Sequence, residues 1–181
     1  MNILIGIFIV VAVVVLLILL TALFLKKNYT VKREIIINKG KDFVFDYIKY
    51  LKNQPNYSKW AKMDPQMKLT FTGTDGEPGF VYRWESTNKN VGQGEQTISK
   101  IERGKRIDYD LHFMKPFDSR ALVYLSTEPA SENTTRVEWG MSSHMKYPFN
   151  IMLVFMNMEK MIGNDFSAGL GNLKSILESG N

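Results

Sequence analysis

Metal chemistry would have to rest on very few side chains in this sequence. The 181 residues contain two histidines, His112 and His144, and no cysteine. A zinc site needs several such ligands that converge, so the sequence predicts none. Thioethers can bind Cu(I), and four methionines lie near one another: Met141, Met145, Met152 and Met156. Because the flexible methionine side chain more often fills irregular apolar space, we interpret them as core or cavity residues and expect no metal and no cofactor.

Acid–base chemistry has one candidate set in the sequence. Asp108, Asp110 and His112 occupy alternate positions, which places their side chains on one face of a strand. The opposite face of that strand would carry Tyr109, Leu111 and Phe113. Since the apolar face should be the buried one, we expect the polar trio to meet water outside any cavity rather than to catalyse a reaction.

The glycines at Gly92 and Gly94 resemble the beginning of a dinucleotide-binding fingerprint. The third glycine of that motif is missing, and the pair opens a predicted strand where the motif requires the start of a helix. Glycines inside a strand often mark a bulge or a bend. We therefore expect these two glycines to bend a sheet rather than to bind phosphate.

Large aromatic side chains at alternate strand positions give the strongest functional signal. Four of them combine a wide apolar surface with a polar atom that needs a partner when buried: Tyr82, Trp84, Tyr109 and Trp139. Ligand pockets are built from many apolar groups and a few well-placed polar ones. These faces predict a cavity for an apolar ligand, and a solid core of the same residues is the alternative.

Turn residues divide the chain after residue 30 into strands, short helices and one long helix. The expected strands cover residues 31–37, 68–72, 79–86, 92–101, 106–113, 119–127 and 135–145. Two short helices are expected at residues 40–51 and 56–63, and one long helix is expected at residues 148–178, where apolar residues recur every three or four positions. Consecutive strands and segregated helices indicate an α+β fold, with an antiparallel sheet covered by the long C-terminal helix.

An uncharged apolar stretch stands near the start of the chain. Residues 3–25 contain no charged side chain, and at about 1.5 Å per residue they extend roughly 35 Å, enough to cross a bilayer core of about 30 Å. The stretch is longer than that of a signal peptide and lacks a small-residue cleavage pattern. We expect residues 1–27 to form a single-pass transmembrane anchor and residues 28–181 to form the following domain. Lys26 and Lys27 follow the span, so the positive-inside rule favours a cytoplasmic domain.

The net charge of +5 falls entirely on the part of the chain that follows the apolar stretch. A basic domain tethered at a membrane is attracted to anionic headgroups. Nucleic-acid binding would require clustered basic residues, whereas here they are scattered among acidic ones. We therefore expect the membrane, and not nucleic acid, to be a partner; the sequence identifies no protein partner.

The order of these elements, together with several short motifs, resembles the START-like (SRPBCC) superfamily and, within it, the polyketide cyclase/dehydrase-like branch. The matching motifs include Val44-Phe45-Asp46-Tyr47-Ile48, the Trp60 segment, Gly92-x-Gly94, Phe113-x-x-Pro116-Phe117, Thr135-x-Val137-x-Trp139 and the Gly-Leu-x-Asn-Leu-Lys ending of the last helix. The resemblance covers about residues 30–178. It implies a helix-grip fold, in which a curved antiparallel sheet wraps around a long C-terminal helix, with a cavity between them.

The resemblance also implies that the cavity binds a hydrophobic ligand such as a lipid, a sterol or a polyketide-like molecule. With the aromatic faces and the methionines, it suggests ten cavity-lining residues: Tyr82, Trp84, Tyr109, Phe113, Trp139, Met141, Met152, Phe155, Met156 and Met158. One alternative is a cyclase-type enzyme that acts on an apolar substrate through Tyr82, Glu95 or His144, although no residue matches a catalytic position. A membrane-tethered protein-interaction module is the other alternative.

Overall fold

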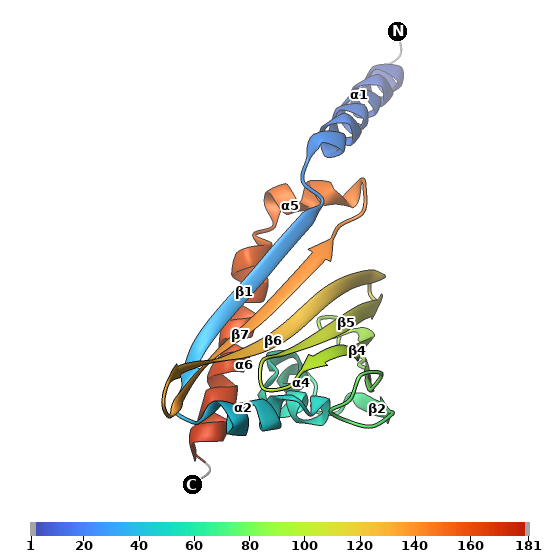
Figure 1. Ribbon diagram of the computed structural model, residues 1–181. Helices are drawn as coiled ribbons and strands as arrows, with labels where there is room; N and C mark the ends of the chain where they lie inside the picture. The colour runs from blue at the N-terminus through green and yellow to red at the C-terminus, as the bar shows by residue number, and fades with distance from the viewer. Residues whose placement is uncertain (1–2, 180–181) are drawn as a thin grey trace.

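A seven-stranded antiparallel sheet and a long C-terminal helix form the domain (Figure 1). The computed structural model describes residues 3–179. The sheet order is β1-β7-β6-β5-β4-β3-β2. The strands are β1 (Asn28–Ile37), β2 (Lys68–Thr72), β3 (Val81–Glu85), β4 (Gln93–Glu102), β5 (Arg106–Lys115), β6 (Ser119–Ser131) and β7 (Thr134–His144). The strands β2 to β7 are neighbours in sequence order. The first strand, β1, pairs with the last, β7, and forms one edge of the sheet, and β2 forms the other edge.

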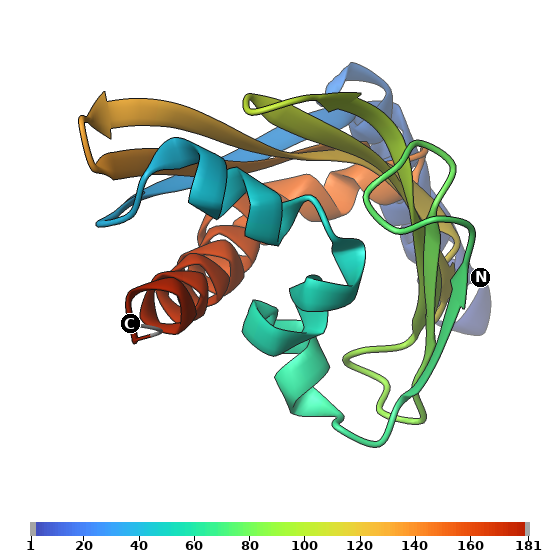
Figure 2. The ribbon, with the colours of Figure 1, turned by 60° about the horizontal axis from the view of Figure 1, so that its bottom comes forward.

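The helices lie on one side of the sheet. Figure 2 shows the sheet curving around α6 (Met158–Ser179), with the shorter helices on the same concave side. The shorter elements between β1 and β2 are α2 (Lys41–Ile48), η1 (Leu51–Asn53), α3 (Gln54–Tyr57) and α4 (Lys59–Met63). This arrangement confirms the α+β helix-grip fold, with the second expected helix divided into shorter pieces.

Alternation along the strands determines which side chains enter the core. Tyr82 and Trp84 point inward from β3, and Val137 and Trp139 point inward from β7, whereas their neighbours in sequence face outward. The strand register shifts between Gln93 and Gly94 and again between Ile98 and Lys100. A Cβ atom at position 94 would lie 2.5 Å from the Trp84 ring, so only glycine lets this ring pack against the strand. Gly94 therefore lies at an irregularity of the sheet, as predicted, whereas Gly92 lies just before β4 with a φ of +66°.

The expected helix over residues 148–178 is not continuous. The structure divides it into η2 (Phe149–Ile151), α5 (Met152–Phe155) and α6 (Met158–Ser179). Met156 has extended backbone angles, and the Asn157 side chain accepts a hydrogen bond from the backbone N–H of Lys160 at 2.8 Å. Asn157 thus caps the N-terminus of α6, and this local cap outweighs the apolar periodicity that runs through the break.

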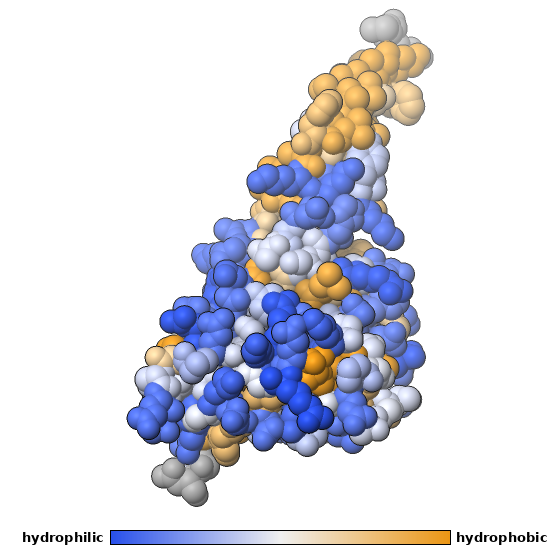
Figure 3. Space-filling model, viewed as in Figure 1, coloured by the Kyte–Doolittle hydropathy of each residue, from blue (hydrophilic) through white to orange (hydrophobic). Residues whose placement is uncertain are grey.

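The N-terminal helix α1 (Ile3–Phe24) extends away from the domain at the end where β1 begins (Figure 1). Among its described residues only Ala22 is buried. In Figure 3 apolar side chains cover this helix, and hydrophilic ones begin where it meets the domain. Within residues 3–179, α1 is the one helix that is long and apolar enough to cross a membrane.

Candidate functional site

An internal cavity of about 210 Å³ lies between the sheet, α4 and α6. Its walls are largely aromatic. Trp139 stacks on Phe166 of α6 with ring centroids 4.7 Å apart, and Trp60 of α4 meets Trp139 edge-on at 6.4 Å. Trp84 and Phe113 form a second edge-on pair across the opposite wall. All three tryptophans of the chain therefore border this one space.

Three polar groups at the cavity wall are buried and have no hydrogen-bond partner within the described residues. They are the Oε1 atom of Gln54, the Nε2 atom of Gln96 and the Nε1 atom of Trp139, and each residue is more than nine-tenths buried. Trp84, by contrast, donates its indole N–H to the carbonyl of Val91 at 3.3 Å. A buried polar group without a partner costs free energy, so three of them on one cavity indicate hydrogen bonds that a bound molecule can supply.

The cavity wall carries no formal charge. Among the described residues that line it there is no Asp, Glu, His, Lys or Arg. Tyr82 is the titratable side chain of the wall, and burial raises its pKa from 10.0 to about 12. The phenol is therefore neutral near physiological pH. A charged ligand would lose its hydration without gaining a countercharge here, so the wall favours an uncharged ligand.

The cavity lies in the half of the domain that is nearer to α1. Asn28 at the start of β1 pairs with His144 at the end of β7, and Ser143 pairs with Ala121 near the start of β6. The β3–β4 and β5–β6 connections lie at this same edge of the sheet. They contribute Asn90, Val91 and Pro116 to the cavity wall, and the first turns of α6 contribute Ile162 and Phe166. The site is therefore oriented toward the apolar helix rather than away from it.

The structure brings together five of the ten side chains expected to line the cavity: Tyr82, Trp84, Phe113, Trp139 and Met141. Tyr109 is fully buried in the core beyond the cavity wall. Met152 and Phe155 are 43% and 82% exposed on α5, and Met156 and Met158 are half-buried outside the cavity wall. The break at Met156 and Asn157 separates Met152 and Phe155 from α6, the helix that borders the cavity.

Two polar residues of the wall, Gln54 and Gln96, were not anticipated. Gln96 alternates with Gly94 and Ile98 on the inner face of β4, so a polar residue on an otherwise apolar face was a signal available in the sequence. Gln54 belongs to α3, a helix of four residues. Such a short helix has too little periodicity to show which of its side chains point inward.

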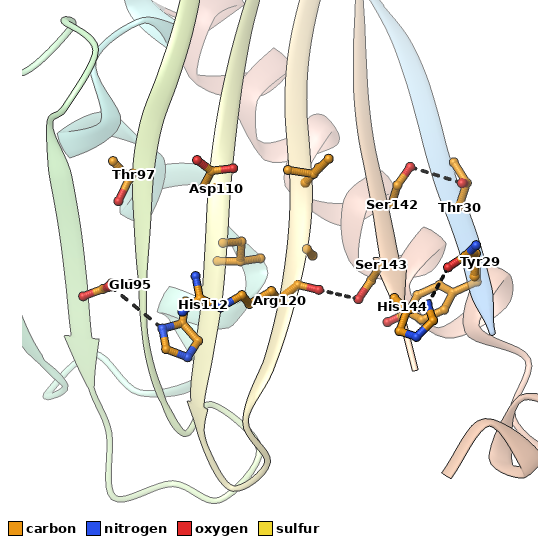
Figure 4. Close-up of a pocket in the computed structure, with 14 residues that line it drawn as sticks. Tyr29, Thr30, Glu95, Thr97, Asp110, His112, Arg120, Ser142, Ser143 and His144 are labelled. Atoms are coloured by element: carbon orange, nitrogen blue, oxygen red, sulfur yellow. Dashed lines mark hydrogen bonds and ion pairs between the residues drawn. The ribbon is translucent and has the colours of Figure 1, made fainter. Parts of the chain in front are cut away.

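A second and larger hollow of about 670 Å³ lies on the outer face of the sheet (Figure 4). It is an open groove that includes Glu95, Asp110, His112 and His144, so Glu95 and His144 lie outside the inner cavity. The polar trio of β5 also faces outward, as predicted. Within the groove, His112 Nε2 lies 3.1 Å from Asp118 Oδ1.

The other histidine of the groove also has a polar partner. His144 Nδ1 lies 2.7 Å from Asn28 Oδ1 on the neighbouring strand. Ser143 in the same groove donates its hydroxyl to the carbonyl of Arg120 at 2.7 Å, a contact visible in Figure 4. These polar groups of the outer groove thus have partners within the protein. We therefore assign the candidate site to the smaller cavity between the sheet and α6.

Comparison with known proteins agrees with this fold. Residues 29–178 match the family model described as polyketide cyclase / dehydrase and lipid transport. No curated protein sequence matches the chain significantly. The chain is similar in structure to norcoclaurine synthase from Thalictrum flavum, solved in complex with dopamine and hydroxybenzaldehyde, at 10% identity and a TM-score of 0.62, covering 85% of this chain and 88% of the other.

Two further solved structures share the fold at low identity. A protein from Thermus thermophilus is 16% identical with a TM-score of 0.59, and the match covers 83% of this chain and 98% of that one. Ara h 8.0201 is 12% identical with a TM-score of 0.57, and the match covers 84% and 99% of the two chains. At these identities the likeness shows the common fold alone.

Proposed function

Because the chain belongs to the polyketide cyclase / dehydrase and lipid transport family, we propose that it is a membrane-anchored protein that binds an uncharged, apolar ligand between its sheet and α6. The observation that carries this proposal is the set of unpaired polar atoms on Gln54, Gln96 and Trp139 in a cavity whose described wall is uncharged and largely aromatic. An apolar molecule with one hydroxyl group matches them in kind, because a hydroxyl can donate to Gln54 Oε1 and accept from the N–H groups of Gln96 and Trp139. Its remaining surface would pack on the aromatic rings.

The cavity volume limits the size of the ligand. Pockets for drug-sized molecules have volumes of about 300 to 1,000 Å³, and this cavity measures about 210 Å³. It therefore fits a small aromatic molecule, or the polar end of a longer lipid whose tail leaves through the α1-proximal edge. Ile162 is only half-buried on the first turns of α6, so a small movement there would enlarge the opening.

Ligand binding is favoured over catalysis by the chemistry of the wall. General acid–base catalysis uses a group whose pKa lies near the working pH. Within the described wall there is no carboxylate or imidazole, and Tyr82 holds its proton because burial raises its pKa to about 12. Glu95 and His144 belong to the outer groove. The residues that an enzyme would need are therefore separated from the space in which a substrate would lie.

The second part of the proposal concerns the N-terminal helix α1 as a membrane anchor. We infer that residues 1–27 span the bilayer once and hold residues 28–181 beside it, because α1 is uncharged and exposed along nearly all of its length. The basic residues Lys26 and Lys27 that follow it favour a cytoplasmic domain. In this orientation the α1-proximal edge, with its loops from β3–β4 and β5–β6, lies next to the source of lipophilic molecules.

Native mass spectrometry of the full chain, released from detergent after incubation with a lipid extract, tests the binding proposal. We expect an added mass on the wild-type protein that is lost from Ala61→Phe, because the new ring fills the cavity beside α4. Ala168→Phe is the matched control, since Ala168 is exposed on α6 and outside the cavity wall. A wild-type protein that stays empty, or equal masses on both variants, would contradict the proposal.

A further inference from the structure

The segment that precedes α6 is fastened to the end of α1. We call residues 147–156 the junction segment; it contains η2 and α5. Its Asn150 side chain is fully buried, and Nδ2 donates to the carbonyls of Ala22 at 2.7 Å and Leu25 at 3.3 Å. The last carbonyls of a helix have no partners within the helix, so this side chain caps α1 from outside. Figure 1 shows α5 next to the domain end of α1.

A second contact fixes the level of the junction segment along α1. The Tyr147 hydroxyl donates to the carbonyl of Leu19 at 3.4 Å. Leu19 precedes the end of the helix at Phe24 by five residues, which corresponds to about 7.5 Å along the helix axis. Tyr147 therefore reaches alongside the final turns of the apolar helix. If α1 spans a bilayer, the junction segment lies at the depth of the lipid headgroups and the first acyl carbons.

The side chains of the junction segment suit that depth. No charged residue occurs from Tyr147 to Met158. Phe149 is 64% exposed, and Met152, Val154 and Phe155 are exposed as well, so the domain does not bury them. Aromatic and aliphatic side chains of this kind bury themselves at the membrane interface. Lys146 and Lys160 flank the segment and can reach anionic headgroups.

We propose that the junction segment inserts its exposed apolar side chains into the interfacial layer of the same membrane that α1 crosses. This inference rests on the proposed anchoring. Its occupant is lipid because the Asn150 and Tyr147 contacts hold these exposed apolar side chains beside the last turns of the apolar helix α1. The two membrane contacts together prevent the domain from rotating about a single tether.

The insertion also gives the cavity a defined relation to the bilayer. The junction segment runs directly into α6, whose Ile162 and Phe166 border the cavity. With residues 147–156 in the interface, the opening beside these two side chains faces lipid. An apolar ligand then passes from the acyl chains to the cavity without crossing bulk water.

Site-directed fluorescence tests the insertion, and the absence of native cysteine makes single labels simple. Full-length Phe155→Cys and Phe149→Cys would each carry an NBD label in vesicles of phosphatidylcholine and phosphatidylglycerol. Lipids with a doxyl group at acyl carbon 5 quench only labels near that depth. We expect about twofold quenching or more at both positions. Ser175→Cys, exposed near the far end of α6, is the control and stays unquenched.

A label at Ile9→Cys, in the N-terminal half of α1 and read with lipids that carry the doxyl group at acyl carbon 12, separates the inference from the proposal on which it rests. Quenching at position 9 without quenching at positions 149 and 155 overturns the insertion and leaves the anchor intact. Absence of quenching at all three positions overturns both. A blue-shifted emission at position 155 that doxyl lipid does not quench shows a protein cover, and this result also overturns the inference. The ligand mass measured in detergent is independent of every one of these outcomes.

Discussion

The two faces of the central sheet are made by neighbouring residues of the same strands, yet they surround very different hollows. Inner and outer neighbours include Gln96 and Glu95, Phe113 and His112, and Met141 and Ser142. The inner cavity measures about 210 Å³ and is aromatic and uncharged. The outer groove measures about 670 Å³ and is polar and open. The larger hollow is thus the one with fewer features of a binding site.

Hydrogen-bond satisfaction, rather than size, separates the two faces. On the outer face, Tyr124 donates its hydroxyl to Glu138 at 2.6 Å, and Lys32 pairs with the same carboxylate at 3.0 Å. The Arg106 guanidinium covers the Tyr124 ring at 3.8 Å. At the inner cavity one polar atom each of Gln54 from α3, Gln96 from β4 and Trp139 from β7 is buried without a partner. Solvent-exposed polar groups can form hydrogen bonds with water, whereas buried ones need a partner from the protein or from a ligand.

Truncating one large side chain on each face should give the largest difference in the free energy of unfolding between the two faces. Trp139 is 2% exposed and stacks on Phe166, so Trp139→Ala should lower the free energy of unfolding by about 3 to 5 kcal/mol. Leu122 on the outer face is 65% exposed, and Leu122→Ala should change it by about 0.5 kcal/mol or less. Urea unfolding of the full chain in micelles, followed by circular dichroism, measures both. Comparable losses would mean that the outer face is packed as tightly as the inner one.

Alkaline pH should destabilise the inner face more than the outer one. Burial raises the pKa of Tyr82 to about 12 from 10.0, so the folded state holds a proton that the unfolded state loses. The stability from this group is complete below pH 10 and is lost as pH rises through about 12, a change of about 3 kcal/mol. Tyr82→Phe should remove this part of the decline in the free energy of unfolding, which urea unfolding measures between pH 9 and 12.

Tyr124 is the outer-face control for this titration. Its pKa is also raised to about 12, first by desolvation and then by the hydrogen bond to Glu138, but the ring is only half-buried. Because of solvent screening, Tyr124→Phe should change the pH dependence of stability less than Tyr82→Phe does. A larger effect from Tyr124→Phe than from Tyr82→Phe would reverse the comparison of the two faces.

Replacing an unpaired amide should have opposite effects on stability and on binding. Gln96→Met keeps the length of the side chain and removes the unpaired Nε2 atom, so the empty protein should gain about 1 kcal/mol of unfolding free energy. The ligand-bound fraction in native mass spectra should fall. On the outer face, Glu138→Gln loses the Lys32 ion pair and should gain no stability. Destabilisation by Gln96→Met would mean that the amide already has a partner in the folded protein.

The smallest expected effect belongs to the outer ion pair. The Lys32 side chain is mostly exposed, with its Nζ atom 3.0 Å from Glu138 Oε2. Lys32→Ala should therefore cost less than about 1 kcal/mol, and the cost should disappear near 1 M salt, where the screening length is about 3 Å. Unfolding at low and high NaCl concentrations checks this. A loss that persists in high salt would show that the outer network contributes to stability as a buried one would.

Much of the fold could be predicted from the sequence, because the two-residue period of strands and the 3.6-residue period of helices describe most of its elements. Alternation correctly placed Tyr82, Trp84 and Trp139 on the buried face, and the outward direction of Asp110 and His112 followed from the same rule. The uncharged stretch at residues 3–25 identified the helix that became α1. These features depend on local residue order, which a sequence records directly.

The methionine-rich segment before α6 shows where such reasoning stops. Met152 and Phe155 continue the apolar period of the final helix, but the Asn157 cap starts α6 after them. The signal was present in Asn157 itself, because asparagine is a favoured N-cap residue. The partnership of Asn150 with α1 joins residues 128 positions apart, and no local pattern reports it. The same is true of which polar atoms remain unpaired in the cavity.

The indole N–H signal of Trp139 tests the central claim most directly. With ¹⁵N-labelled tryptophan, the full chain in lipid nanodiscs gives three indole signals, all from the cavity wall, which single Trp→Phe variants assign. On titration with 2-naphthol, an uncharged aromatic alcohol, the Trp139 signal should move downfield as its unpaired N–H gains an acceptor. The Trp84 signal should move less, because its N–H is already bonded to Val91. A titration that leaves Trp139 unchanged would contradict the account.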